Sequence, residues 1–201
     1  MSERIIVLIL PVFYLSTFST RNLLVKKRTQ QVVRGRSRLL MLSIILSTLC
    51  FIVTILSTYF KQWYYFMGTI AILTKPLITY SGFLLFLVSV VFGWIVSGQL
   101  KDSWRVGVIE DQKTELVKTG IYTHVRNPYF LSYYLMFFSL FLVRPSFVLL
   151  GLVIATATVF HLMVLKEEQY LLNMHGQNYI KYKSNTGRYM PRLGRGMLDD
   201  T

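Results

Sequence analysis

Residues 116–131 read Leu-Val-Lys-Thr-Gly-Ile-Tyr-Thr-His-Val-Arg-Asn-Pro-Tyr-Phe-Leu, a short polar passage between two long apolar regions. The passage contains a glycine turn at Gly120 and then Arg126-Asn127-Pro128, which opens a new apolar run. Proline is tolerated in the first turn of a helix, where its missing N–H has no partner, and asparagine is a favoured N-cap. The stretch therefore predicts a membrane helix that begins at Asn127. The free N–H groups and positive dipole end of that helix would face a polar loop and could hold a charged or polar ligand at the membrane surface.

The composition on both sides of this stretch is typical of a membrane protein. Apolar residues make up 53% of the 201 residues and charged residues 15%, against about 25% charged residues in soluble domains. Spanning a bilayer takes about 20 apolar residues. We expect an all-α integral membrane protein with about five transmembrane helices: Ile5–Thr20, Leu39–Phe60, Leu77–Ser97, Tyr129–Val143 and Ser146–Leu165.

We expect these spans to form a single membrane domain over residues 1–201. Residues 1–100 would hold three N-terminal spans, and residues 101–201 a loop, a helical hairpin and a tail. Only Arg144-Pro145 separates the last two spans, so these two should form a tight antiparallel hairpin.

The net charge of +13 is distributed unevenly between the two sides of the membrane. The segments after the first, third and fifth spans hold seven, five and six Lys and Arg, whereas the other three segments hold one, two and one. Positive charge marks the cytosolic side, so we expect an external N-terminus and a cytosolic C-terminus, in a bacterial inner membrane or the endoplasmic reticulum. The basic loops then suit anionic lipid headgroups, and nucleic acid is not an expected partner. The single cysteine, Cys50, rules out an internal disulfide and a thiolate metal cluster, and no metal is expected.

The end of the fifth span carries several polar groups. Helical spacing places His161 and Glu168 on one face and Met163 and Glu167 on another. Inside the span, His161 is either functional or a neutral histidine that is hydrogen-bonded to a neighbouring helix. Glu167 and Glu168 fall at the predicted C-terminal end of this helix, where negative charge is unfavourable. A cation should therefore compensate them, either Lys166 or a bound cationic ligand.

Three further features have simple structural interpretations. Small residues on the second and third spans predict helix-packing seams: Ser43, Ser47, Thr54 and Thr58, and then Ser89, Gly93 and Ser97. Ser103-Trp104-Arg105 is typical of an anchor at the membrane interface. The tail Asn173–Arg195 is rich in Tyr and Gly, and it would either lie on the headgroup layer or fold as a lid over a pocket.

Residues 116–191 resemble the isoprenylcysteine carboxyl methyltransferase family and the related phospholipid methyltransferases. The resemblance lies in Leu116-Val117, Gly120, Tyr122, Arg126-Asn127-Pro128, Glu167-Glu168, Gly176, Tyr179, Tyr182, Gly187-Arg188 and Pro191. The order of the motifs, their spacing and the hairpin between them fit the family pattern, and Ser103-Trp104-Arg105 is similar to bacterial members. The resemblance implies a membrane enzyme that uses S-adenosylmethionine to methylate a lipophilic, membrane-partitioned acceptor, most directly a carboxyl group of isoprenylcysteine type.

The same resemblance implies roles for individual residues. The cofactor-binding residues would be Glu115, Leu116, Val117, Tyr122, Asn127, Pro128, Tyr129 and Glu167. Among these, Leu116, Val117 and Tyr122 would line the adenosyl group, and Glu167 would hold the methionine ammonium. Arg126 and Glu168 would position groups, with Arg126 either clamping the methionine carboxylate or extending to the interface. The substrate contacts would be His161, Met163 and Arg188. The cofactor brings the reactivity, so no protein nucleophile is required.

Several positions depart from the family pattern. Asn127, Phe130 and His175 replace the usual His, Tyr and Phe, and Met163 stands where carboxyl methyltransferases carry an arginine suited to the substrate carboxylate. A thioether cannot neutralise a carboxylate, so a phospholipid amine or a small thiol remains an alternative acceptor. Two other classes stay open as well, a steroid-reductase-like NADPH oxidoreductase and a non-catalytic membrane protein whose polar cluster serves topology alone.

Overall fold

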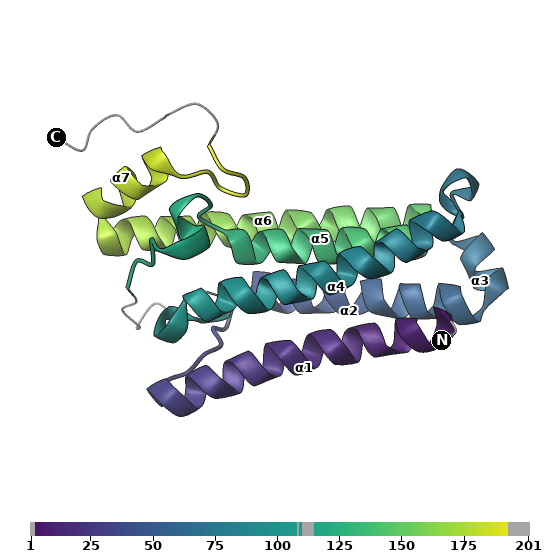
Figure 1. Ribbon diagram of the computed structural model, residues 1–201, viewed down its shortest axis with the longest axis horizontal. Helices are drawn as coiled ribbons and strands as arrows, with labels where there is room; N and C mark the ends of the chain where they lie inside the picture. Colours follow the sequence, from purple (N-terminus) through teal and green to yellow (C-terminus); the bar gives the residue numbers. More distant parts are fainter. Residues whose placement is uncertain (1–2, 108, 110–114, 193–201) are drawn as a thin grey trace.

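A computed structural model of the protein describes residues 3–107, 109 and 115–192. Over these residues the chain forms helices and isolated bridges, without a β-strand. The long helices run side by side along the long axis of the molecule, with α3 at one end and α7 at the other (Figure 1). The α-helices are α1 (Glu3–Thr29), α2 (Arg38–Tyr59), α3 (Lys61–Phe66), α4 (Pro76–Gln99), α5 (Pro128–Val143), α6 (Phe147–His175) and α7 (Gln177–Asn185). Short 3-10 helices form η1 (Ala71–Leu73), η2 (Lys101–Ser103) and η3 (Gly120–Thr123).

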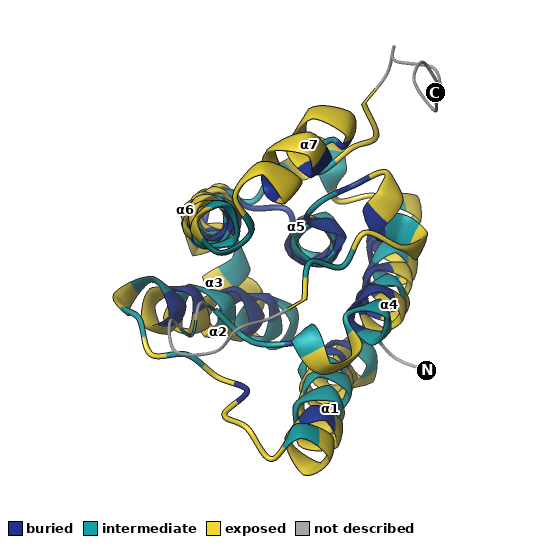
Figure 2. Ribbon diagram, turned by 90° about the vertical axis from the view of Figure 1, so that its left-hand side faces the viewer, coloured by how far each residue is buried: buried dark blue, intermediate teal, exposed yellow. Residues whose placement is uncertain are grey.

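Four helices, α1, α2, α4 and α6, are long and apolar enough to cross a membrane. The fourth predicted span, α5, has 16 residues, which is about 24 Å of helix against a hydrocarbon core of about 30 Å. Figure 2 shows α5 surrounded by α4, α6 and α7, and nine of its residues are buried. Because its neighbours cover it, α5 does not have to match the bilayer thickness by itself. The predicted all-helical membrane fold is confirmed, with four helices long enough to span a membrane and a shorter central helix.

Two helices extend well beyond their predicted ends. The first span was predicted to end at Thr20, but α1 continues to Thr29 through a basic run, which suits a helix C-terminus. The predicted end of α6 at Leu165 was also wrong, because good helix formers continue to His175 and the helix stops only at Gly176, with φ 50°. Glu167 therefore lies about two turns before the helix end. The unfavourable dipole contact inferred for the two glutamates does not arise.

Small residues allow α4 and α5 to approach closely. The predicted seam on the third span is confirmed, because Ser89, Gly93 and Ser97 are buried. A Cβ atom added at Gly93 would lie 2.9 Å from Ser132 Oγ of α5, and one added at Gly82 would meet the α5 backbone at the same distance. The two helices thus pack backbone to backbone, and this contact fixes the position of α5.

Polar contacts hold α1 at both ends. The predicted hairpin between α5 and α6 is confirmed, with Arg144 in the turn that joins the two helices. The Arg144 guanidinium donates to Glu3 Oε2 of α1 at 2.6 Å and to Thr58 Oγ1 of α2 at 3.0 Å. At the opposite end of α1, the indole N–H of Trp104 donates to Asn22 Oδ1 at 2.9 Å. Trp104 is only 3% exposed, so the prediction that it anchors the protein at the membrane interface was wrong. Its ring instead joins α1 to the loop that follows α4.

Candidate functional site

The site is organised around the start of α5. Pro128 occupies the first turn, and Asn127 is the N-cap residue, as predicted. The Asn127 side chain makes no capping hydrogen bond, however. Its amide donates to Glu168 Oε1 of α6 at 3.1 Å. A hydrogen bond from the amide N–H to a carboxylate is stronger than the neutral hydrogen bond that a capping side chain accepts from a backbone N–H. The Asn127 side chain therefore turns toward α6.

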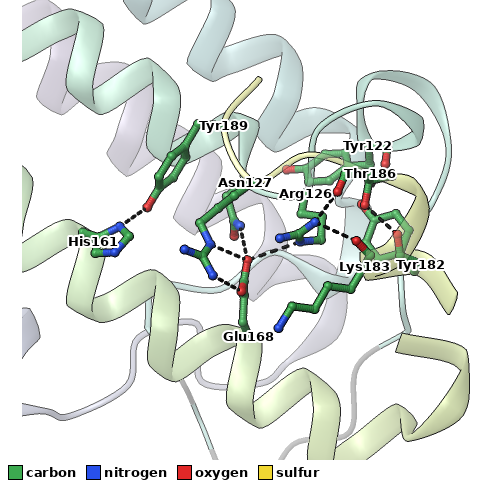
Figure 3. A network of polar contacts seen from close by, with 10 residues as sticks. Tyr122, Arg126, Asn127, His161, Glu168, Tyr182, Lys183, Thr186 and Tyr189 are labelled. Carbon is green, nitrogen blue, oxygen red and sulfur yellow. Dashed lines mark hydrogen bonds and ion pairs between the residues drawn. The ribbon is translucent and has the colours of Figure 1, made fainter. Parts of the chain in front are cut away.

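Glu168 accepts hydrogen bonds from three side chains, and we call this group the Glu168 cluster (Figure 3). Oε1 accepts from Arg126 Nε at 3.3 Å, from the Asn127 amide, and from Arg188 Nε at 3.0 Å. Oε2 accepts from Arg188 Nη2 at 2.9 Å. The Glu168 side chain is 6% exposed. This carboxylate therefore joins the start of α5, the middle of the C-terminal half of α6 and the tail.

The tail pairs with the loop before α5 through backbone hydrogen bonds. The N–H groups of Arg126 and Asn127 donate to Gly187 O at 2.8 Å and to Arg188 O at 3.1 Å, and Gly187 N donates to His124 O at 3.1 Å. A Cβ atom on Gly187 would lie 1.7 Å from Met190 O, so this close approach requires glycine. The tail thus folds back onto the loop before α5.

Two buried tyrosines complete this side of the site. The Tyr182 hydroxyl of α7 donates to Tyr122 O at 2.7 Å. Burial raises the pKa of Tyr182 to about 12. Burial also raises the pKa of Tyr122 well above its usual value, and the Glu167 carboxylate adds to this shift. Both phenols therefore stay protonated at neutral pH and can act as hydrogen-bond donors.

A cavity of about 470 Å³ lies beside these contacts. Its volume is within the range of roughly 300–1,000 Å³ that is usual for small-molecule sites. At one end, the loop end, it is lined by residues of the loops, α6 and α7, including Ser103, Trp104, Arg105, Leu116, Tyr122, Glu167 and Tyr182. From there an apolar limb extends between α1 and α2, lined by residues that include Pro11, Leu15, Ile44, Thr48, Ile52 and Ile55. One continuous cavity thus joins a polar end to an apolar one.

Most of the predicted cofactor residues lie on this cavity. Its walls include Glu115, Leu116, Val117, Tyr122, Asn127, Tyr129 and Glu167, together with Arg126 and Met163. Pro128, His161, Glu168 and Arg188 do not line it. The two faces predicted for the α6 sequence are confirmed, because Met163 and Glu167 face the cavity, whereas His161 and Glu168 contact the tail.

His161 lies in a hydrogen-bonded group outside the cavity. Its Nδ1 is 2.8 Å from the Tyr189 hydroxyl (Figure 3). The Tyr189 hydroxyl accepts from the Tyr134 hydroxyl at 3.0 Å. The histidine therefore has a hydrogen-bond partner, but this partner lies in the tail and not on a neighbouring helix as the second alternative expected. These contacts attach the tail to α5 and α6.

The guanidinium of Arg126 is occupied within the protein. Besides Glu168, it donates to the carbonyl oxygens of Lys183, at 3.1 Å, and Thr186. Its side chain is only 8% exposed. The carboxylate clamp predicted for Arg126 would require it to exchange at least one of these partners for the cofactor.

Sequence reasoning missed several cavity residues. Ser43 and Ser47 were assigned to a packing seam, yet both line the cavity. Arg34 and Arg105 also line it, and the Arg105 guanidinium lies 4.6 Å from the centre of the Tyr170 ring of α6. Among the described residues, no group of three or more His, Cys, Asp and Glu is arranged to hold a metal ion.

Comparison with known families gives a match to phospholipid methyltransferase over residues 77–178, just over half of the chain. The chain belongs to the phospholipid methyltransferase family. This placement favours the methyltransferase hypothesis over the NADPH oxidoreductase and non-catalytic alternatives. A search of curated proteins gave no match.

The chain also resembles a solved structure, that of the eukaryotic intramembrane Ras methyltransferase ICMT (isoprenylcysteine carboxyl methyltransferase). The two are 18% identical, with a TM-score of 0.58 over 75% of this chain and 52% of the other. The chain therefore spans about half the length of that enzyme. At this identity the similarity establishes a common fold.

Proposed function

We propose that the cavity binds S-adenosylmethionine at its loop end and a lipophilic methyl acceptor in its apolar limb. One observation carries the proposal, namely that a single cavity of about 470 Å³ connects a polar end with an apolar channel between α1 and α2. A charged methyl donor and a hydrocarbon-bearing acceptor require these two environments side by side. Family membership supports the reaction class, because phospholipid methyltransferases transfer methyl groups.

The methyl donor would occupy the wall that the sequence already indicated. Leu116, Val117 and Tyr122 line the loop end, where they would enclose the adenosyl group. Glu167 faces the same space and would hold the methionine ammonium. Arg105 lies near enough to Glu167 to interact with its charge, so this pair offers complementary partners to the ammonium and carboxylate of an amino acid.

The acceptor would lie along α2. Cavity-lining residues run from Leu40 to Ile55, which corresponds to about 22 Å of helix. This length suits a long hydrocarbon chain, and the apolar limb continues directly into the loop end. The reacting group of the acceptor would then meet the sulfonium where the two parts of the cavity join, near Asn127 and Met163.

Methyl transfer here needs alignment and a dry site rather than a protein nucleophile. The bond between sulfur and the methyl carbon breaks as a bond from the acceptor atom to that carbon forms, and the sulfonium becomes a neutral thioether. With a carboxylate acceptor the product is a neutral ester, and no proton has to be removed. Carboxyl methylation of isoprenylcysteine type is the leading reaction, and N-methylation of a phospholipid amine or S-methylation of a small thiol is the alternative.

The proposed membrane orientation places this chemistry on the cytosolic side. The loop end is formed by residues from the segments that follow the first, third and fifth predicted spans, which are the segments rich in Lys and Arg. By the positive-inside rule the C-terminus would then be cytosolic and the N-terminus external. A cytosolic opening gives the site direct access to S-adenosylmethionine.

The test is a binding measurement on the purified protein in a neutral detergent. Isothermal titration with S-adenosylhomocysteine should show binding, and thermal stabilisation should be seen with this ligand and not with NADPH. Glu167→Gln should weaken binding at least about tenfold, because it removes a charged partner of the ammonium. Asp102→Asn is the matched control, since Asp102 forms an exposed pair with Arg28 and does not line the cavity. Normal affinity in Glu167→Gln would refute the site assignment.

The acceptor can be identified in a second experiment. Incubation with radiolabelled S-adenosylmethionine and total membrane extract should label a lipid-soluble fraction. Loss of the label in base would indicate an ester and support carboxyl methylation. A base-stable label would instead favour an amine or a thiol.

A further inference from the structure

Two arginines from loops far apart in the sequence line the same cavity. The segment that follows α1 pairs with the segment that follows α4, through hydrogen bonds from Gly35 N to Val106 O at 2.9 Å and from Val106 N to Val33 O at 2.8 Å. This pairing is a parallel bridge between Arg34 and Val106. It brings Arg34 next to Arg105, and both arginines line the cavity.

The segment that carries Arg105 is fixed on several sides. Trp104 is buried and lies edge-on to the Tyr129 ring of α5, with ring centres 4.4 Å apart. Arg105 stacks on Tyr170 of α6. At Gly107 a Cβ atom would lie 3.7 Å from Leu40 of α2, so this residue also rests against the helix bundle. The backbone at Arg34 is therefore paired with a segment that packs on the helix bundle, and Arg34, an exposed residue, lines the cavity.

Charge distinguishes Arg34 from the other cations on this wall. Arg126 is held by Glu168, and Arg105 lies near the Glu167 carboxylate. Within the described ranges, no carboxylate forms an ion pair with Arg34. An acidic group of a bound molecule would form an ion pair with the Arg34 guanidinium.

The location of Arg34 indicates which molecule would supply that charge. Arg34 precedes α2 by four residues, and the lining of the apolar limb continues from Leu40 along the same helix. A hydrocarbon chain in the limb would consequently place its head group near Arg34. Glu167, where the methyl donor would bind, belongs to α6 on another wall.

We infer that Arg34 is the residue that binds an acidic group of the methyl acceptor, whereas Arg105 stays with the methyl donor. A guanidinium forms paired hydrogen bonds with either a carboxylate or a phosphate. The inference rests on the proposed function, since it assigns the head-group end of the same cavity. If the acidic group is itself the methylated carboxylate, one oxygen stays with Arg34 while the other forms the new bond to the methyl carbon.

The experiment measures binding of matched amphiphiles to the full chain in neutral detergent. Laurate, dodecyl phosphate, dodecanol and dodecylamine share one hydrocarbon chain and differ in head group, so laurate and dodecyl phosphate separate the two anionic sources. In the wild type we expect laurate, dodecyl phosphate or both to bind more tightly than dodecanol and dodecylamine. Arg34→Gln should weaken anion binding about tenfold or more and leave dodecanol unchanged. Arg34→Lys should restore part of the loss, because it keeps the charge and not the paired geometry.

Two controls separate this inference from the proposed function. Arg36→Gln removes a charge from the same loop at an exposed residue that does not line the cavity. If Arg36→Gln lost as much affinity for the anionic amphiphiles as Arg34→Gln, the effect would be a general attraction of anions to a basic surface, and the inference would be overturned. S-Adenosylhomocysteine affinity should be unchanged in Arg34→Gln, and a tenfold loss would reassign Arg34 to the methyl donor. If the wild type does not bind S-adenosylhomocysteine at all, the proposed function fails, whatever the amphiphiles do.

Discussion

Replacing Glu168 by glutamine should destabilise the protein, even though Glu168 does not line the cavity. The substitution removes a charge that faces Arg126 and Arg188 and an acceptor of the Asn127 amide, at a side chain that is 6% exposed. Breaking a buried ion pair from one side costs about 3–5 kcal/mol. Glutamine keeps one oxygen, and the Arg188 side chain is 32% exposed, so we expect the lower limit of that range, about 3 kcal/mol.

A loss of that size corresponds to a melting temperature roughly 6–12 °C lower for a chain of this length. Thermal unfolding in neutral detergent, followed by circular dichroism, measures it directly. The matched variant is Glu167→Gln, one residue earlier on the cavity face, which should weaken S-adenosylhomocysteine binding without a comparable fall in melting temperature. If Glu168→Gln melts within 2 °C of the wild type, or if the two variants behave alike, the structural role assigned to the Glu168 cluster is wrong.

Two further predictions concern the tail. Gly187→Ala would place a Cβ atom 1.7 Å from Met190 O, so we expect overpacking to cost about 1–3 kcal/mol and hydrogen exchange of the tail to rise; unchanged exchange would contradict the described backbone pairing. Tyr182→Phe removes the hydroxyl that donates to Tyr122 O and should cost about 1 kcal/mol. Burial raises the pKa of this phenol to about 12, above its unfolded value of about 10, so its contribution is complete below pH 10 and is lost as the pH rises toward 12. Melting temperatures across this range should therefore fall more steeply in the wild type than in Tyr182→Phe, and parallel curves would refute the assignment.

The features that could be predicted from the sequence have local causes. Pro128 fixes the start of α5, and the short turn at Arg144 fixes the hairpin. The two faces of α6 follow from helical periodicity alone, so the separation of Glu167 from Glu168 was predictable. What each face contacts was not, because this depends on how α6 is rotated against α5 and the tail.

Other features depend on contacts between distant segments. The pairing of Arg34 with Val106 joins residues more than 70 positions apart, and neither segment carries a local pattern that indicates it. Trp104 next to an arginine is typical of a membrane interface, yet the ring is buried because Asn22 and Tyr129 enclose it. The helix ends at Thr29 and His175 were missed because basic and amphipathic helix formers continue the helices beyond their apolar cores.

The Glu168 cluster has a consequence for the order in which the protein is made. The loop before α5 leaves the ribosome before its hydrogen-bond partners do. Arg126 pairs with the Glu168 carboxylate and with the carbonyl oxygen of Gly187, and both are synthesised later than Arg126. During synthesis, N-terminal parts of a chain have the opportunity to fold first. Here the spans can insert while the Glu168 cluster is still incomplete, and its completion would be among the last events of biosynthesis. A nascent chain stalled before Arg188 would hold its long helices without the contacts that join the tail to α5 and α6.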